Sequence, residues 1–347
     1  MKYSEIKKTG IKIPEILFGT SALGNLYQDL AEEVKLYIVK ECIIHIDGTV
    51  VFDSAGKYGA GLALEKLGEK LRALHVPPEK VVISNKLGWM RIPLTSEEPN
   101  FEKGVWKNIR HDARQSIGYR EILTCWEQGN QLLGRPYTAN LVSVHDADEY
   151  LLSAEKDRGK ENKLFRDILD AYKALHDLKA EGKVKAIGIG AKDWRIIQRI
   201  AQHIELDWVM FANSMTIYRH PPELIRFMDE LASREIILIN SAVFNAGFLT
   251  GGNYFDYQHV DENHPAKNKL YTWRNSFYEI CQMYNVQPAN ACIHFGKSHP
   301  GVVSIALNTS KPDHVKRNID AVQEGVPTEF YLEMKNRELI HPDYPYV

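Results

Sequence analysis

Short apolar runs rich in β-branched residues alternate with longer amphipathic segments along most of this chain of 347 residues. Residues 184–190, 208–212 and 235–240 are predicted strands, and residues 194–202 and 222–233 are the predicted helices that connect them. Strands that alternate with helices in this way pair in parallel. Because about eight such units close a barrel, we predict an α/β fold of the (β/α)8 TIM-barrel type.

The remaining elements follow the same rhythm. Weak alternation around Thr9 and Gly10 indicates an N-terminal hairpin over residues 2–13 that closes the bottom of the barrel. The charged residues 156–163 are predicted to be a solvated surface segment, and residues 250–265, rich in Gly, Asn, Asp and Tyr, a long loop at the carboxyl rim. Further strands are predicted at residues 16–20, 50–54, 81–86, 140–145 and 302–307, and further helices at residues 32–44, 61–74, 112–134, 164–180, 270–284 and 289–298.

Length and composition limit the class of protein. A barrel of this type commonly takes about 250 residues plus insertions, so residues 1–347 are predicted to form a single domain with long loops. The formal charge of −2 argues against a nucleic-acid partner. No apolar run approaches the roughly 20 residues of a membrane span, and the four cysteines show neither disulfide nor metal-ligand spacing. These features predict a cytoplasmic protein; they do not indicate its oligomeric state.

Polar residues stand where predicted strands end. Asp53, Lys86 and His145 each close an apolar run, and Tyr58 lies in a glycine-flanked turn five positions after Asp53. Singly, each has an ordinary explanation, such as a helix cap, a snorkelling lysine or a satisfied histidine. In parallel strands all four would meet at one rim, where the catalytic groups of barrels lie. A carboxylate at a buried strand end also needs a positive partner, and Lys86 is the candidate.

In this context the four residues resemble the catalytic tetrad of the aldo-keto reductases. The resemblance runs from Phe18 to Asn318 and is closest to the branch containing D-threo-aldose (L-fucose) and L-galactose 1-dehydrogenases, through residues 24–27, the pair His145-Asp146 and residues 243–247. It implies NAD(P)-dependent hydride transfer between nicotinamide and an aldose C1, or a related aldehyde or alcohol carbon. Oxidation of L-fucose or D-threo-aldose sugars would give lactones.

The resemblance gives each tetrad residue a role. A tyrosine pKa of about 10 is too high for easy proton exchange at neutral pH. A nearby ammonium, that of Lys86, is expected to lower the pKa of Tyr58, while Asp53 keeps the lysine charged and in place. Tyr58 would then act as general acid or base, and His145 would donate a hydrogen bond to the same substrate oxygen.

A cofactor segment is expected after the last strand, in Asn308, Thr309 and Ser310, because a helix starts near residue 312 and its amino terminus suits a phosphate. Alone, the segment is also an ordinary helix cap. The resemblance matches it to the adenosine-phosphate segment, matches Asn318 to an adenine contact, and aligns His314 where NADP-preferring relatives carry arginine. A neutral imidazole holds a dianion poorly, which favours NAD, but Lys311, Lys316 and Arg317 can compensate, so NADP stays open.

Other predicted contacts depend on the resemblance alone. Gly190, Ala191, Ala212 and Ser241 replace the family's usual nicotinamide contacts. The predicted cofactor residues therefore include Asn213 and Phe244 as substitutes, together with Gly19, Thr20 and Asp53. The predicted substrate residues are Asn25, Tyr27, Tyr58, Trp89 and His145, although simple loop packing explains Trp89 equally well.

Several alternatives stay open on the sequence. An NAD(P)H-dependent aldehyde or ketone reductase and a non-catalytic cofactor-binding regulator would share the fold. A metal-dependent hydrolase could draw on His145, Asp146 and Asp148, but the other strand ends supply Asn, Gly and Ser, so no metal site is predicted. The aromatic residues 254–257 could clasp a ligand or pack on their own protein.

Overall fold

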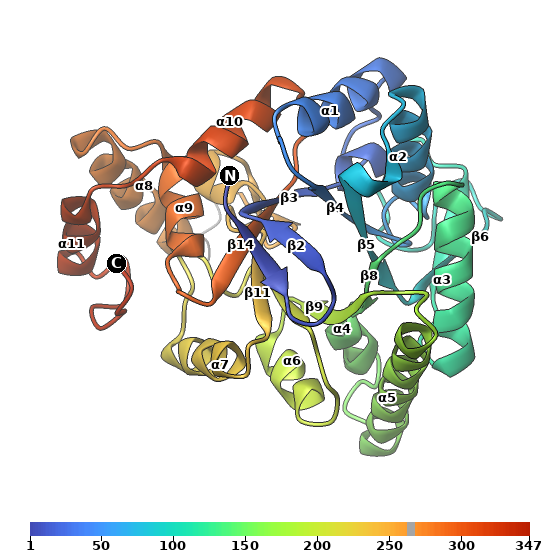
Figure 1. The fold of residues 1–347 in the computed structure, drawn as a ribbon. Coiled ribbons are helices and arrows are strands. Elements are labelled where there is room, and N and C mark those ends of the chain that lie inside the picture. The colour runs from blue at the N-terminus through green and yellow to red at the C-terminus, as the bar shows by residue number, and fades with distance from the viewer. Residues whose placement is uncertain (262–267) are drawn as a thin grey trace.

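The predicted barrel is present in the computed structural model, which describes residues 1–261 and 268–347. Among these residues, eight parallel strands pair in the order of the chain, and the last pairs with the first (Figure 1). The fold prediction is confirmed. The strands are β3 (Ile16–Gly19), β4 (Val50–Ala55), β5 (Val81–Leu87), β8 (Leu141–His145), β9 (Ala186–Ala191), β10 (Trp208–Ala212), β11 (Ile237–Ser241) and β14 (Val302–Leu307).

Amphipathic helices surround the barrel because each buries one apolar face. Leu64, Leu67 and Leu71 of α2, which recur at helical spacing, are fully buried. The helices that follow the successive strands around the barrel are α1 (Glu32–Ile44), α2 (Leu62–Ala73), α3 (Tyr119–Leu133), α5 (Arg158–Ala180), α6 (Trp194–Ala201), α7 (Pro222–Ser233), α9 (Pro288–Lys297) and α10 (Asp313–Gln323). The other helices described are α4 (Ala147–Leu152), α8 (Asn268–Met283), α11 (Thr328–Asn336) and the short 3-10 turns η1 (Ser21–Gly24), η2 (Pro78–Lys80) and η3 (Phe248–Thr250).

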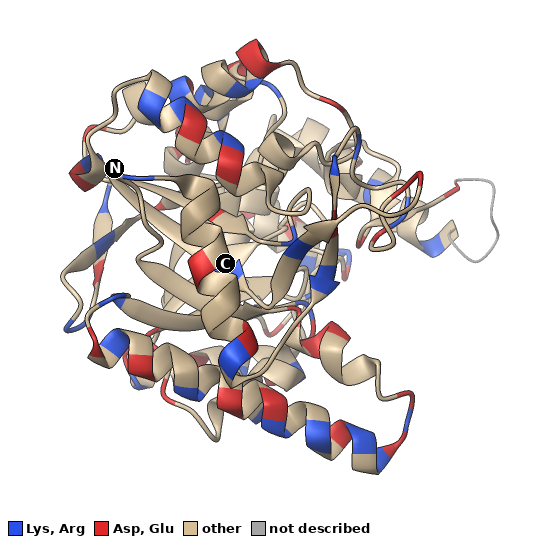
Figure 2. Cartoon of the chain, turned by 90° about the vertical axis from the view of Figure 1, so that its right-hand side faces the viewer, with Lys and Arg blue, Asp and Glu red and all other residues tan. Residues whose placement is uncertain are grey.

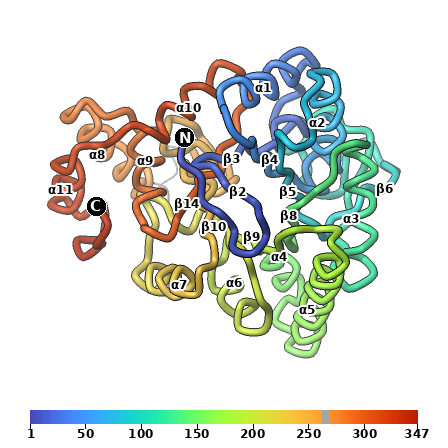
Figure 3. The backbone as a smooth tube through the Cα atoms, in the orientation of Figure 1, coloured from blue at the N-terminus to red at the C-terminus, as the bar shows by residue number. Residues whose placement is uncertain are grey.

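The predicted N-terminal hairpin closes the amino end of the barrel. Strands β1 (Tyr3–Ile6) and β2 (Ile11–Pro14) pair antiparallel and lie across this end (Figure 3). Their isoleucines join inward residues of the strands, including Leu17 and Trp208, in one buried cluster. Gly188 makes room for the indole, since a Cβ at that position would lie 2.1 Å from the ring of Trp208.

Two boundaries predicted from sequence are wrong. Residues 112–118 are not helical: β7 (His111–Gln115) pairs antiparallel with β6 (Trp89–Pro93) outside the barrel. Asp112 accepts backbone hydrogen bonds from Asn100 at 3.0 Å and from Ala113 at 2.8 Å, the kind of local bonding that competes with a helix. Helix α5 begins at Arg158 rather than at residue 164, because Asp157 caps it by accepting from the Lys160 N–H at 3.0 Å.

The rim loop after β11 carries a small hairpin that the sequence did not predict. Strands β12 (Tyr254–Phe255) and β13 (Gln258–His259) pair there, and residues 262–265 of the predicted loop lie outside the described residues. The helices α4 and α11 were not predicted either.

Charged residues of both signs are interspersed over the helices (Figure 2). This distribution accords with the formal charge of −2. None of the helices in residues 1–261 and 268–347 is long and apolar enough to cross a membrane. All four cysteines are buried free thiols in the structure.

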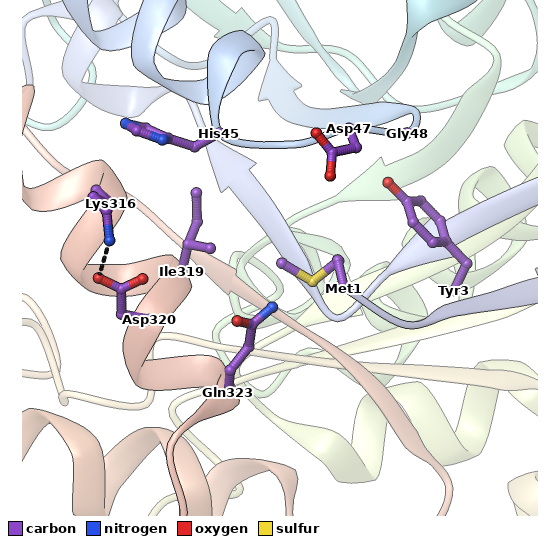
Figure 4. Close-up of a pocket in the computed structure, with 9 residues that line it drawn as sticks. All are labelled: Met1, Tyr3, His45, Asp47, Gly48, Lys316, Ile319, Asp320 and Gln323. Carbon is purple, nitrogen blue, oxygen red and sulfur yellow. Dashed lines mark hydrogen bonds and ion pairs between the residues drawn. The ribbon is translucent and has the colours of Figure 1, made fainter.

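A hollow of about 410 Å³ lies between β1, the turn before β4 and α10 (Figure 4). Tyr3, Asp47 and Lys316 are among its lining residues, and the Lys316 ammonium bonds Asp320 at 2.6 Å. Because Asp47 precedes β4, this hollow lies at the amino ends of the strands. The polar residues singled out in the sequence lie at the other end.

Candidate active site

Four polar side chains meet at the carboxyl rim of neighbouring strands. Asp53, Lys86 and His145 lie on β4, β5 and β8, which are consecutive in the barrel, and Tyr58 lies in the turn after β4. The Lys86 ammonium bonds the Asp53 carboxylate and lies 4.7 Å from the centroid of the Tyr58 ring. The Tyr58 and His145 rings meet edge-on with centroids 5.8 Å apart. The structure therefore brings all four predicted residues together.

Glycine fixes the position of the turn that carries Tyr58. Gly59 has φ of +60°, and a Cβ there would lie 2.3 Å from the carbonyl oxygen of Gly24. The turn after β4 can therefore pack directly on the loop after β3 only because residue 59 has no side chain. This close packing places the Tyr58 side chain next to Lys86.

A cavity of about 770 Å³ opens above the four residues. Part of its wall consists of aromatic side chains, those of Tyr27, Trp106, Phe244 and Tyr257. Beside His145 the wall is charged instead, with Lys57, Glu102, Asp146 and Lys192. A mostly apolar pocket with a few convergent polar groups is the usual form of a small-molecule site.

Burial sets the protonation states of Tyr58 and His145, whose rings are in contact. Burial raises the pKa of Tyr58 well above 10, and the Asp53 carboxylate raises it further. The Lys86 ammonium, which we expected to lower this pKa, lies 4.7 Å from the Tyr58 ring centroid, but the net shift of the Tyr58 pKa in this structure is upward. Burial lowers the pKa of His145 to about 3, so its imidazole is neutral at physiological pH. Tyr58 and His145 are both present as neutral hydrogen-bond donors.

A buried lysine next to Tyr58 was not singled out in the sequence. The Lys57 ammonium bonds Asp146 at 2.7 Å, Glu102 at 2.8 Å and Glu149 at 3.0 Å. Burial opposes ionisation of Asp146, but the positive charge of Lys57 helps to hold its pKa below its usual value. The sequence contained one signal for the pair of Lys57 and Asp146, namely that each is adjacent to a predicted catalytic residue. Lys57 directly precedes Tyr58, and Asp146 directly follows His145.

The predicted cofactor residues divide into two groups. Gly19, Asp53, Phe244, Asn308, Thr309, Ser310 and His314 line the cavity. Thr20, Asn213 and Asn318 are not among its lining residues. Thr20 is buried and donates its hydroxyl hydrogen bond to the Asp53 carbonyl at 3.1 Å, which is a structural role. The Asn213 side chain is buried, with no hydrogen-bond partner for its amide among the described residues.

The edge of the cavity at β14 suits a dinucleotide. Asn308, Thr309, Ser310 and Lys311 follow the strand and present amide, hydroxyl and ammonium groups before α10. Gly19 lets this segment approach, because a Cβ there would lie 3.1 Å from the Cβ of Asn308. These groups fit the polar phosphates of a nicotinamide cofactor.

The predicted substrate residues are also placed unequally. Tyr27, Tyr58 and His145 line the cavity, and Tyr27 stacks on Tyr254 at 5.0 Å between ring centroids. Asn25 does not line it: its amide nitrogen donates to Asp29 at 3.0 Å and to the Lys107 carbonyl at 3.0 Å, which fixes the loop.

Trp89 lies outside the cavity, where its ring packs on Phe101 at 5.9 Å and beneath Lys57. The loop-packing interpretation therefore describes Trp89. Trp106, which the sequence analysis missed, forms the wall, with its ring 5.9 Å from that of Tyr58.

The hydrolase alternative has no ligand set in the part of the chain that the structure describes. No group of three or more His, Cys, Asp and Glu side chains is arranged there to hold a metal ion. Asp148, one of the residues considered, accepts backbone hydrogen bonds from Lys192 at 3.1 Å and Asp193 at 3.0 Å.

Comparison with known proteins finds a matching family model and relatives that are named dehydrogenases. Residues 15–336 match the model of the Aldo/keto reductase family. The chain is 26% identical over 345 residues to a pyridoxal 4-dehydrogenase of Microbacterium luteolum, with 96% of each chain covered. It is 25% identical over 340 residues to a D-threo-aldose 1-dehydrogenase of a Pseudomonas species, covering 95% of this chain and 96% of the relative.

A solved structure resembles the fold at lower identity. The holo form of an aldo-keto reductase from Bacillus halodurans superposes with a TM-score of 0.69 at 18% identity. The match covers 98% of this chain and 96% of the other. At this identity the likeness concerns the fold.

Proposed function

The chain belongs to the aldo/keto reductase family of NAD(P)-dependent oxidoreductases, and we propose that it oxidises a sugar of the D-threo-aldose or L-fucose type at C1, giving a lactone. The observation that carries the proposal is the meeting of Tyr58, Lys86 and His145 on one cavity, with Asp53 holding the lysine. The cofactor, when bound, supplies the hydride-accepting carbon of its nicotinamide.

Tyr58 is the proposed proton-transfer residue. Its hydroxyl would give a proton to the substrate oxygen in reduction and take one in oxidation. Because burial raises the pKa of Tyr58, the phenol is the resting form and proton loss is the demanding step. The Lys86 ammonium, 4.7 Å from the ring centroid, stabilises the negative charge that develops on the phenol oxygen.

His145 is the proposed orienting residue. Its neutral imidazole would donate a hydrogen bond to the same substrate oxygen that Tyr58 contacts, and fix the reacting carbon. The edge-on arrangement of the two rings, 5.8 Å between centroids, supports a shared target between them.

Ion pairs on α10 favour NAD over NADP. Lys316 bonds Asp320 at 2.6 Å, and Arg317 bonds Asp313 at 3.1 Å, so both cations are engaged on their own helix. No ion pair of the Lys311 ammonium is found among the described residues. A 2′-phosphate would therefore meet Lys311 and a histidine, His314, rather than the arginine that pairs bidentately with phosphate.

The cavity suits a hydroxylated substrate. Aromatic faces such as Trp106 can pack on the apolar side of a sugar ring, and the charged wall near Asp146 can bond its hydroxyls. One relative is named D-threo-aldose 1-dehydrogenase. A second candidate, pyridoxal, is an aromatic aldehyde that the same wall of Tyr27, Trp106 and Tyr257 would accommodate, and another relative is named for it.

A substrate panel tests the proposal. L-Fucose, D-arabinose, L-galactose and pyridoxal are each incubated with NAD and with NADP, and the absorbance of the reduced cofactor is followed. We expect the highest kcat/KM with an aldose and NAD. Turnover of pyridoxal alone would select the second candidate. Reduction of simple aldehydes without oxidation of any panel compound would select the reductase, and absence of turnover with intact cofactor binding would select the regulator.

A further inference from the structure

Lys57 is a buried charge that the proposed reaction does not use. Its side chain is 5% exposed and contacts carboxylates from separate segments of the rim. Glu102 comes from the loop between β6 and β7, whereas Asp146 and Glu149 lie after β8. Glu149 in turn bonds the Lys192 ammonium at 2.5 Å.

The contacts of Lys57 argue against direct substrate binding. Its ammonium donates hydrogen bonds to Asp146 at 2.7 Å and to Glu149 at 3.0 Å, and it forms an ion pair with Glu102 at 2.8 Å. A substrate hydroxyl would have to displace one of these charged acceptors. Removal of Lys57 would leave the buried Asp146 carboxylate without this cation, which is costly for a buried charge. Lys57 therefore acts through the acids that it holds.

Asp146 connects Lys57 to His145. One carboxylate oxygen, Oδ2, accepts from Lys57, and the other, Oδ1, lies 3.5 Å from Nε2 of His145. The backbone of Asp146 is fixed too, since its carbonyl accepts from the Gln115 side chain at 3.2 Å and from the Tyr150 N–H at 2.9 Å. The carboxylate is thus held on both sides, with one oxygen directed at the imidazole.

A carboxylate beside Nε2 decides which nitrogen of a neutral imidazole carries the proton. An N–H near a negative charge is favoured over a lone pair near it, and at 3.5 Å, with no hydrogen bond found between His145 and Asp146 among the described residues, the Nε2–H stays available to a substrate oxygen. The other nitrogen, Nδ1 of His145, is sealed from solvent and has no hydrogen-bond partner among the described residues. Only Nε2 can therefore reach a substrate oxygen in the cavity.

We propose that Lys57 is a positioning residue: it holds Asp146 against His145, so that the imidazole keeps its proton on Nε2 and can donate into the cavity. The inference rests on the proposed function for its catalytic consequence. Its structural statement concerns the tautomer of His145 and stands without any turnover.

The experiment is nitrogen NMR of protein labelled with ¹⁵N-histidine. The signals of His145 are identified by their loss in His145→Gln, because the chain contains 13 histidines. We expect the Nε2–H tautomer in the wild-type protein. In Lys57→Met and in Asp146→Asn the Nδ1–H tautomer should become populated, and Lys57→Arg should restore the wild-type pattern at least in part. kcat should fall about tenfold, the equivalent of one hydrogen bond, with the KM for NAD unchanged.

Lys179→Met is the matched control. Lys179 also forms a close ion pair, with Asp207 at 2.6 Å, but this pair lies at the amino end of β10. It should leave the His145 signals as they are. If Lys57→Met does not fold, Asp146→Asn, which keeps the side-chain volume, decides the question.

Two failures are distinguishable. An unchanged His145 tautomer in both Lys57→Met and Asp146→Asn overturns the inference, whatever the activity. An enzyme without turnover on the substrate panel overturns the proposed function, while a tautomer that responds to Lys57 leaves the positioning role intact.

Discussion

At the amino end of the barrel, Leu17, Val51 and Trp208 pack on the isoleucines of the β1–β2 hairpin. At the carboxyl end the same sheet presents Asp53 and Lys86 to an open cavity. The apolar end gains stability from burial, because its side chains lose water and pack closely, although the buried indole N–H of Trp208 has no hydrogen-bond partner among the described residues. The polar end has to place buried charges in pairs, which adds little stability but sets protonation states. We infer that stability and reactivity are separated along the strands.

The substitution with the largest expected effect on this separation is Tyr58→Phe. The change removes only the hydroxyl, so the proposed proton transfer is lost and kcat should fall about 10²- to 10⁴-fold. The Kd for NAD and the melting temperature should stay near the wild-type values. Steady-state kinetics, cofactor titration by fluorescence and thermal denaturation measure the three quantities. Weakened cofactor binding with normal turnover would contradict the assigned role.

The converse test is Trp208→Ala at the amino end. Trp208 is 1% exposed and fills the interior beside Gly188, so its truncation leaves a large cavity. The free energy of unfolding should fall by about 3–5 kcal/mol, as for other buried aromatic residues. Chemical denaturation measures the loss, and kcat of the folded protein at low temperature should change little. A variant of normal stability but low kcat would show that the two ends are not separate.

A smaller effect is expected in the pH dependence of the reaction rate, and the protonation of Tyr58 sets its direction. Because the pKa of Tyr58 is raised well above 10, the phenol stays protonated at neutral pH. Oxidation needs the group to accept a proton, so its rate should increase steadily from neutral to alkaline pH. Reduction needs a proton donor and should not show this increase. The kcat of both directions measured over the same pH series tests the prediction, and a plateau of the oxidation rate at neutral pH would contradict it.

Local patterns predicted the barrel and the meeting of the four rim residues. Strand periodicity and the polar residue at each strand end are properties of short segments, and parallel pairing then brings Asp53, Lys86 and His145 to the same rim. The helix predicted over residues 112–134 was wrong in its first part, residues 112–118. Asp112 bonds Asn100 in the preceding loop, and hydrophobic periodicity carries no information about such a contact. Asn25 was misplaced for the same reason, since its partner Lys107 lies in another loop.

Charges and pKa values could not be predicted from the sequence. The cation of Lys57 is balanced by acids that lie 45 to 92 positions further along the chain, and only the fold brings them together. The pKa of Tyr58 was predicted from Lys86 alone, whereas burial raises it in the structure. The roles of the four rim residues, the contacts of Asn213 and Asn318, and a cytoplasmic location stay predictions.

The smallest predicted effect concerns the edge of the cavity near α10. His314 lines the cavity, while the cations Lys316 and Arg317 are paired with acids of their own helix. His314→Arg adds a permanent charge with donors that match a phosphate, so the Kd for NADP should fall roughly tenfold, about the strength of one charge-assisted hydrogen bond. The Kd for NAD should change much less, because NAD lacks the 2′-phosphate. Titration of both cofactors into the wild-type protein, His314→Arg and the size-matched His314→Gln separates the effect of charge from that of shape. Equal changes for NAD and NADP would mean that His314 lies away from the ribose, and that the cofactor specificity of this end of the barrel is set by other residues.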